Sequence, residues 1–137
     1  MTSNEAIVRR FGEVVNEADS VDAVMAELEQ LMDPEIEFVN PADAIDGSGT
    51  RKGIAGMRIA VENFVAGAGA GATIEVDELE ERGDRVFVQG RVHVKGAASG
   101  AEVVGPPVGS VYTFRDGRIL RIEWHYDVAK ARAAFDS

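Results

Sequence analysis

The stretch that decides the fold runs from residue 73 to residue 95 and reads TIEVDELEERGDRVFVQGRVHVK. From Thr73 onward, apolar and polar side chains alternate with a period of two, which is typical of β-strands. Gly83-Asp84 interrupts the alternation and predicts a tight turn. The pattern continues to the last strand of the chain, with further breaks at Ala97 to Gly100 and at Asp116-Gly117. The expected strands of this antiparallel meander cover residues 73–82, 85–96, 102–115 and 118–127.

Upstream of the meander, the apolar residues recur at helical spacing instead. The expected helices cover residues 6–18, 21–32 and 54–66, and a short helix from Val128 to Phe135 closes the chain. Asp33-Pro34 ends the second helix, because proline disfavours a helical conformation in the residue before it, and Ile36 to Val39 then form a short strand. The stretch from Pro41 to Gly53 is expected to be a loop. Helices followed by an antiparallel sheet predict an α+β domain.

Composition restricts the possible classes of protein. A chain of 137 residues fits one domain, residues 1–137, with one core. The sequence has no cysteine and no apolar run of membrane-spanning length, so we expect a cytoplasmic protein without disulfides, zinc-thiolate sites or membrane contact. The formal net charge of −10 would repel phosphate backbones, which argues against a nucleic-acid partner.

The second meander strand has two different faces. One face carries the valine row Val86, Val88, Val92 and Val94, and the other carries the polar row Phe87, Gln89, Arg91, His93 and Lys95. On the pattern alone we favour the interpretation that the valines face the core and the polar row faces water. In the last strand, the shared apolar face consists of Leu120, Ile122, Trp124 and Tyr126. This alternation places His93 and His125 on opposite sides of the sheet, so we expect no metal site.

Four short motifs add a resemblance that covers essentially the whole chain. They are Phe38-Val39-Asn40-Pro41, Arg91-Val92-His93, Phe114-Arg115-Asp116-Gly117-Arg118-Ile119 and Trp124-His125-Tyr126-Asp127. With the order of elements, they make the chain similar to the SnoaL-like branch of the cone-shaped α+β barrel superfamily, which also includes ketosteroid isomerase, limonene epoxide hydrolase and nuclear transport factor two. The resemblance implies that the helices pack on the concave face of a strongly curved sheet around a ligand cavity. It also implies that the convex face often joins two subunits.

The resemblance implies the opposite polarity for the second meander strand. Gln89, Arg91 and His93 would face the cavity, and the valine row would cover a homodimer contact on the outer sheet face. The implied catalytic residues are Asn40, which would orient a carbonyl or a water, Arg91, which would stabilise an oxyanion, and His93, which would move a proton. The implied substrate-binding residues are Phe38, Gln89, Tyr112, Trp124 and Tyr126. Stacking of Arg91 on Trp124 as a structural cation–π pair is the alternative.

The carboxylates that relatives use are missing at the matching positions. Matching to ketosteroid isomerase puts Asn40 at the base and Pro107 close to the acid, which disfavours ordinary steroid isomerisation. Matching to limonene epoxide hydrolase pairs its asparagine with Asn40 and its arginine with Arg91, but its aspartates fall on His93 and Trp124. We therefore expect a cofactor-free protein that binds a small apolar or carbonyl-containing molecule and acts as a cyclase, isomerase, dehydratase or hydrolase. The alternatives are a non-catalytic ligand-binding or structural dimer, and a protein-binding module that uses the outer sheet face.

Overall fold

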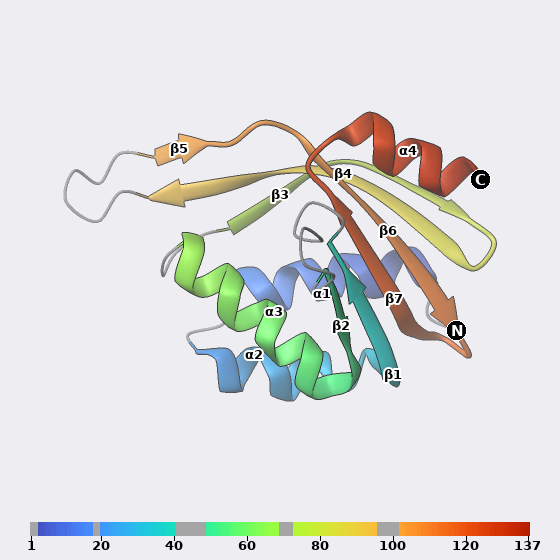
Figure 1. Ribbon diagram of the computed structural model, residues 1–137, viewed down its shortest axis with the longest axis horizontal. Helices are drawn as coiled ribbons and strands as arrows, with labels where there is room; N and C mark the ends of the chain where they lie inside the picture. Colours follow the sequence, from blue (N-terminus) through green and yellow to red (C-terminus); the bar gives the residue numbers. More distant parts are fainter. Residues whose placement is uncertain (1–2, 18–19, 41–48, 69–72, 96–101) are drawn as a thin grey trace.

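The computed structural model describes residues 3–17, 20–40, 49–68, 73–95 and 102–137, apart from the side chains of residues 63–68 and 94–95. Its helices are α1 (Asn4–Glu17), α2 (Val21–Leu28), α3 (Gly53–Ala68) and α4 (Val128–Asp136). Its strands are β1 (Met32–Val39), β2 (Thr50–Lys52), β3 (Thr73–Arg82), β4 (Arg85–Lys95), β5 (Glu102–Val104), β6 (Val108–Arg115) and β7 (Arg118–His125). The expected α+β architecture is confirmed (Figure 1).

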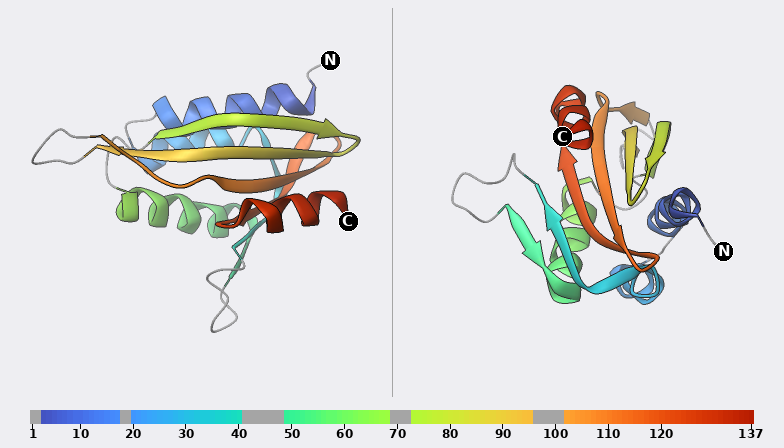
Figure 2. Two further views of the ribbon diagram at one scale, coloured as in Figure 1. Left: turned by 90° about the horizontal axis from the view of Figure 1, so that it is seen from above. Right: turned by 90° about the vertical axis from the view of Figure 1, so that its right-hand side faces the viewer.

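The seven strands form one sheet in the order β2-β1-β7-β6-β4-β3, and β5 pairs with the far end of β4. Neighbouring strands run antiparallel except for β1 and β7, which are parallel. This parallel pair brings the short strand near the start of the chain beside the last strand of the meander. The resulting sheet is strongly curved (Figure 2).

Helices α1, α2 and α3 cover the concave face of the sheet and enclose the main core (Figure 1). The core residues that the structure describes are Ile7, Val8, Phe11, Val14, Val24, Met25, Leu28, Met32, Ile36, Met57, Val61, Val86, Val88, Tyr112, Phe114, Ile119 and Ile122. Helix α1 runs beside the edge strand β3 and is fixed at both ends. The Glu5 amide donates to Glu81 at one end, and the Asn16 side chain exchanges two hydrogen bonds with the backbone of Ile74 at the other. The helix thereby satisfies backbone groups of an edge strand that would otherwise be open to pairing.

Helix α4 covers part of the opposite, outer face. A second apolar cluster there joins Phe87 and Val111 from the sheet to Ala131 and Phe135 from the helix. Gly109 allows this close approach, because a Cβ atom at that position would lie 2.5 Å from the Cβ of Ala131. The helix begins at the N-cap Asp127, whose side chain accepts a hydrogen bond from the Ala129 amide.

Three local expectations need correction. The second helix ends at Leu28 rather than at residue 32, and β1 already begins at Met32, where burial of the apolar side chain is complete. The expected loop between residues 41 and 53 contains β2, which pairs with β1. The third meander strand is divided into β5 and β6, because Pro106 and Pro107 lack the amide protons that a ladder needs.

None of the described helices is both long and apolar enough to span a membrane.

Candidate functional site

The register of the sheet decides which face each β4 side chain occupies. Val86 pairs with Tyr112 and Val88 pairs with Ser110, and both valines are buried in the main core on the concave face. Phe87 lies between them and packs on the outer face below α4. The interpretation from alternation alone is therefore confirmed for the two valines. The opposite polarity that the resemblance implied is wrong here, because apolar side chains gain most when they are removed from water.

Several residues of the concave face come together where β1, β6 and β7 lie side by side. Trp124 pairs with Ser110, and one step further along, Ile122 pairs with both Tyr112 and Phe38. Phe38 packs against the main core, and Tyr112 is buried in it, edge-on to a core aromatic ring. Three residues expected to bind a ligand, namely Phe38, Tyr112 and Trp124, thus share one face of the sheet.

Asn40 and Ser110 are the buried polar residues in the described part of the chain. Asn40 follows β1 directly, its backbone amide donates to the Gly49 carbonyl at 2.7 Å, and continued alternation puts it on the side of Phe38. Ser110 was not among the candidates from sequence. A usable signal was present, because it is the polar member of an otherwise apolar alternating row, Val108, Ser110, Tyr112 and Phe114.

Gln89, Arg91 and His93 lie on the outer face instead. The irregularity in the β3–β4 hairpin falls on β3, so all three residues keep the side of Phe87 along a regular β4. Their expected direction, into a cavity on the concave face, is wrong. Stacking of Arg91 on Trp124 is excluded as well, because the two side chains occupy opposite faces of the sheet.

Arg91 and His93 belong to a chain of ion pairs across β3, β4 and β5. Arg91 Nε lies 2.9 Å from Asp77 Oδ2, and Arg91 Nη2 lies 2.9 Å from Glu75 Oε2. His93 Nε2 lies 3.1 Å from the same Glu75 oxygen, and His93 Nδ1 contacts Glu102 Oε1. The hydrogen bonds from Arg91 lower the pKa of Asp77, and those to Glu102 and Glu75 raise the pKa of His93. These groups are tied to one another on a partly exposed surface.

The remaining candidates at the end of β7 also differ from expectation. Tyr126 lies in the bend between β7 and α4 and is 59% exposed, so it does not line the concave face. His125 pairs with Gly109, which pairs with Gln89, so it lies on the outer face on the same side as His93, and this contradicts the expected opposite placement. Its Nε2 lies 3.0 Å from Glu123 Oε2. Burial alone would raise the pKa of Glu123, but His125 and a neighbouring arginine hold it below its usual value.

The concave group offers hydrogen-bond donors rather than acids and bases. Burial raises the pKa of Tyr112, which keeps its phenol protonated at neutral pH. The Ser110 hydroxyl and the Trp124 indole N–H are also donors. No hydrogen bond joins any of these three groups to another described residue. Across the described ranges, no group of three His, Asp or Glu side chains could hold a metal ion.

The outer face carries a separate open groove of about 650 Å³ over β1, β2, β6 and β7. Its described lining consists of Pro34, Glu35, Glu37, Lys52, Gly53, Thr113, Arg115, Leu120 and Arg121. Arg115 is engaged by Asp33 and Glu35, at 3.0 Å and 2.8 Å. The groove therefore has a mixed-charge wall and lies on the face opposite to the concave donors.

Comparison with known proteins shows the family of the chain. The model of the SnoaL-like domain matches residues 8–122, which is most of the chain. No curated protein sequence matches.

Solved structures agree over the whole fold. A nuclear transport factor two-like protein of unknown function from Burkholderia pseudomallei is 26% identical, with full coverage of both chains and a TM-score of 0.69. TerC, co-crystallised with polyporic acid, is 23% identical over 98% of each chain, with a TM-score of 0.67. A suggested polyketide cyclase from Sinorhizobium meliloti is 19% identical over 87% of this chain and 93% of its own, with a TM-score of 0.64.

Proposed function

Because the chain belongs to the SnoaL-like family, we propose that it binds a small apolar molecule with a carbonyl or similar acceptor oxygen on the concave face of its sheet. The apolar part of the ligand packs against Phe38 and Trp124. The acceptor oxygen receives hydrogen bonds from the hydroxyls of Ser110 and Tyr112. Binding of this kind uses a mainly apolar surface with a few polar groups that fix the orientation of the ligand.

The observation that carries this proposal is the set of donors without a protein partner. Ser110, Tyr112 and Trp124 each bring one donor to the concave face, and none is joined by a hydrogen bond to another described residue. Among the described residues, the buried side-chain atom without a partner is Arg132 Nη1, so the three donor atoms of the concave face keep contact with solvent. A ligand oxygen that accepts these hydrogen bonds takes the place of water. TerC offers support, because that neighbour was crystallised with an organic acid.

The chemistry of the five concave residues favours binding over acid–base catalysis. Asn40, Ser110, Tyr112, Phe38 and Trp124 include neither a carboxylate nor an imidazole. Donors of this kind stabilise negative charge on an oxygen but do not remove a proton at neutral pH. An enzyme that uses His93 as its base, the first hypothesis from sequence, would need that side chain to turn through the sheet to the other face. The non-catalytic alternative therefore has the better support.

The test measures ligand binding by calorimetry and by the fluorescence of Trp124, the single tryptophan of the chain. The probes are polyporic acid and 2-acetylnaphthalene, an apolar molecule with one carbonyl oxygen. Loss of one neutral hydrogen bond costs about 0.5–1.5 kcal/mol, so S110A and Y112F should each raise Kd by roughly 2- to 12-fold.

The matched control is H93Q, which changes a polar residue of β4 on the opposite face. Its Kd should equal that of the parent protein. Binding that is insensitive to S110A and Y112F but lost in H93Q would contradict the placement of the site. Absence of binding for both probes, with Trp124 fluorescence unchanged at saturating concentration, would contradict the proposed ligand class.

A further inference from the structure

The contacts of His93 restrict its protonation state. Nδ1 faces Glu102 Oε1 and Nε2 faces Glu75 Oε2, so each ring nitrogen meets a carboxylate oxygen. An ionised carboxylate only accepts hydrogen bonds, and a neutral imidazole has only one N–H to donate. Both contacts are hydrogen bonds only when the ring is the doubly protonated imidazolium.

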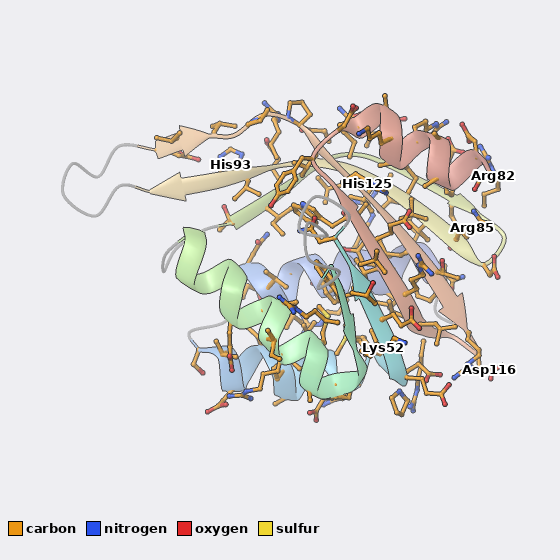
Figure 3. All side chains as sticks on the ribbon, in the orientation of Figure 1. Lys52, Arg82, Arg85, His93, Asp116 and His125 are labelled. Carbon is orange, nitrogen blue, oxygen red and sulfur yellow. The ribbon has the colours of Figure 1, made fainter. Side chains whose placement is uncertain are left out.

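The position of His93 means that its protonation state affects how three strands are held together. Glu75 belongs to β3, His93 to β4 and Glu102 to β5, so one ring links three strands on the outer face of the sheet. His93 lies where β4 runs beside β5 (Figure 3). Two further described charged groups lie near the ring, Arg91 on β4 and Asp77 on β3. The pKa of Asp77 is lowered mainly by its hydrogen bond from Arg91 and also by the charge of His93. Among these described groups, three carboxylates face one permanent cation, Arg91, and the excess of negative charge favours the imidazolium.

Strand β5 has little else to hold it. It is three residues long, all three are exposed, and Val103 is 64% exposed, so apolar burial contributes little to its attachment. Its backbone pairs with β4 over three positions, and the Gly105 amide then donates to the Val92 carbonyl at 2.9 Å. Loss of the contact between His93 and Glu102 therefore removes a large share of the side-chain attachment of this strand.

We propose that protonated His93 is a pH-sensitive clasp that fastens β5 to β4 and β3, and that deprotonation of the ring releases β5 from the sheet. The raised pKa of His93 gives the direction of the effect. Attachment is complete below the ordinary histidine pKa of about 6.5, and it weakens as the pH rises through the higher value of the fastened state. This inference is independent of the proposed ligand, because the clasp lies on the opposite face from the concave donors.

The test is amide hydrogen exchange across the pH range from 6 to 9, expressed as protection factors so that the intrinsic base catalysis cancels. Protection of the Gly105 amide should fall with rising pH, roughly tenfold for each unit by which the His93 pKa of the fastened state exceeds that of the released state. The reference is the Phe114 amide, which donates to Asp84 at 2.8 Å at the other end of the sheet and should show no such fall. An NMR titration of both histidines accompanies the exchange measurement.

Two variants separate the clasp from a general loss of structure. E102Q should lower the His93 pKa towards its ordinary value and remove the pH dependence at Gly105, and H93Q should remove that dependence entirely. The matched control is H125Q, whose ring contacts one carboxylate and should leave the Gly105 profile unchanged. A His93 pKa at or below about 6.5, or Gly105 protection that is flat with pH in the parent protein, would overturn the proposal.

Discussion

At the residue scale, single positions decide where close packing is possible. Gly90 tolerates no side chain, since a Cβ atom there would lie 2.5 Å from the Glu75 carbonyl oxygen at the irregular part of the β3–β4 hairpin. Gly109 plays the same role beneath α4. On the concave side, Ser110 is the position where a small polar group interrupts an apolar row. At each of these positions, the neighbouring residues on the adjacent strand or helix determine which side chain fits.

The glycine argument gives a direct stability prediction. Gly109→Ala should lower the free energy of unfolding by about 1–3 kcal/mol, because the new methyl group collides with Ala131 and α4 must shift. Urea denaturation measures the change. Gly12→Ala is the matched control, because no described atom lies within 4 Å of a Cβ atom at that position in α1. It should raise stability by up to about 1 kcal/mol through helix propensity, and equal effects of the two substitutions would contradict this account.

At the scale of elements, α4 and β5 are attached in contrasting ways. Helix α4 buries apolar side chains against β4 and β6, and its last turn accepts hydrogen bonds from Arg85 at the Ala134 and Phe135 carbonyls. Arg132 adds an ion pair to Glu80 and lies 5.0 Å above the centre of the Phe87 ring. Strand β5 relies on a few backbone bonds and the His93 clasp. The helix should therefore remain attached under conditions that release the strand.

Removal of the main anchor of α4 tests this contrast. Phe135→Ala should cost about 3–5 kcal/mol in the free energy of unfolding, because the Phe135 side chain is 3% exposed and its loss uncovers Phe87. Val103→Ala on β5 should change stability by less than about 0.5 kcal/mol, since Val103 is exposed. Chemical denaturation measures both variants, and a comparable loss from the two would show that α4 is not the more firmly packed element.

At the scale of the whole molecule, the outer face is divided. Helix α4 covers the part over β4 and β6, and the expected valine row is not available there, because Val86 and Val88 are in the core. The groove around Leu120 remains open and carries both Lys52 and Glu37. A surface with both signs of charge can complement its own copy across a two-fold axis.

We propose that the homodimer expected from sequence forms at this groove rather than through the valine row. Leu120→Asp should then convert a dimer into a monomer, because it places a carboxylate in the centre of the contact, and sedimentation velocity at micromolar concentration measures the change. Val103→Asp, on exposed β5, is the control and should leave the sedimentation coefficient unchanged. A parent protein that sediments as a monomer would contradict the proposal.

Much of the architecture was predictable because local rules determine it. The alternation after Thr73, the turn at Gly83-Asp84 and the helical spacing upstream predicted the helices, the meander and the α+β class. The site was predictable only in part. Phe38, Tyr112 and Trp124 do share a face of the sheet, but Arg91 and His93 do not belong with them.

The sequence by itself determined the periods of the elements, the meander and the presence of two different faces on each strand. The alternation favoured the core side for Val86 and Val88, but only the tertiary structure settled which face of β4 is concave, because both rows of an alternating strand are compatible with a sheet that has a helix layer on either side. In this molecule α4 packs over Phe87, α1 to α3 pack over Val86 and Val88, and residues 91 and 93 follow Phe87 to the outside. The burial of Val86 and Val88 outweighs the preference of any one polar side chain, and only the packed molecule shows where that burial occurs.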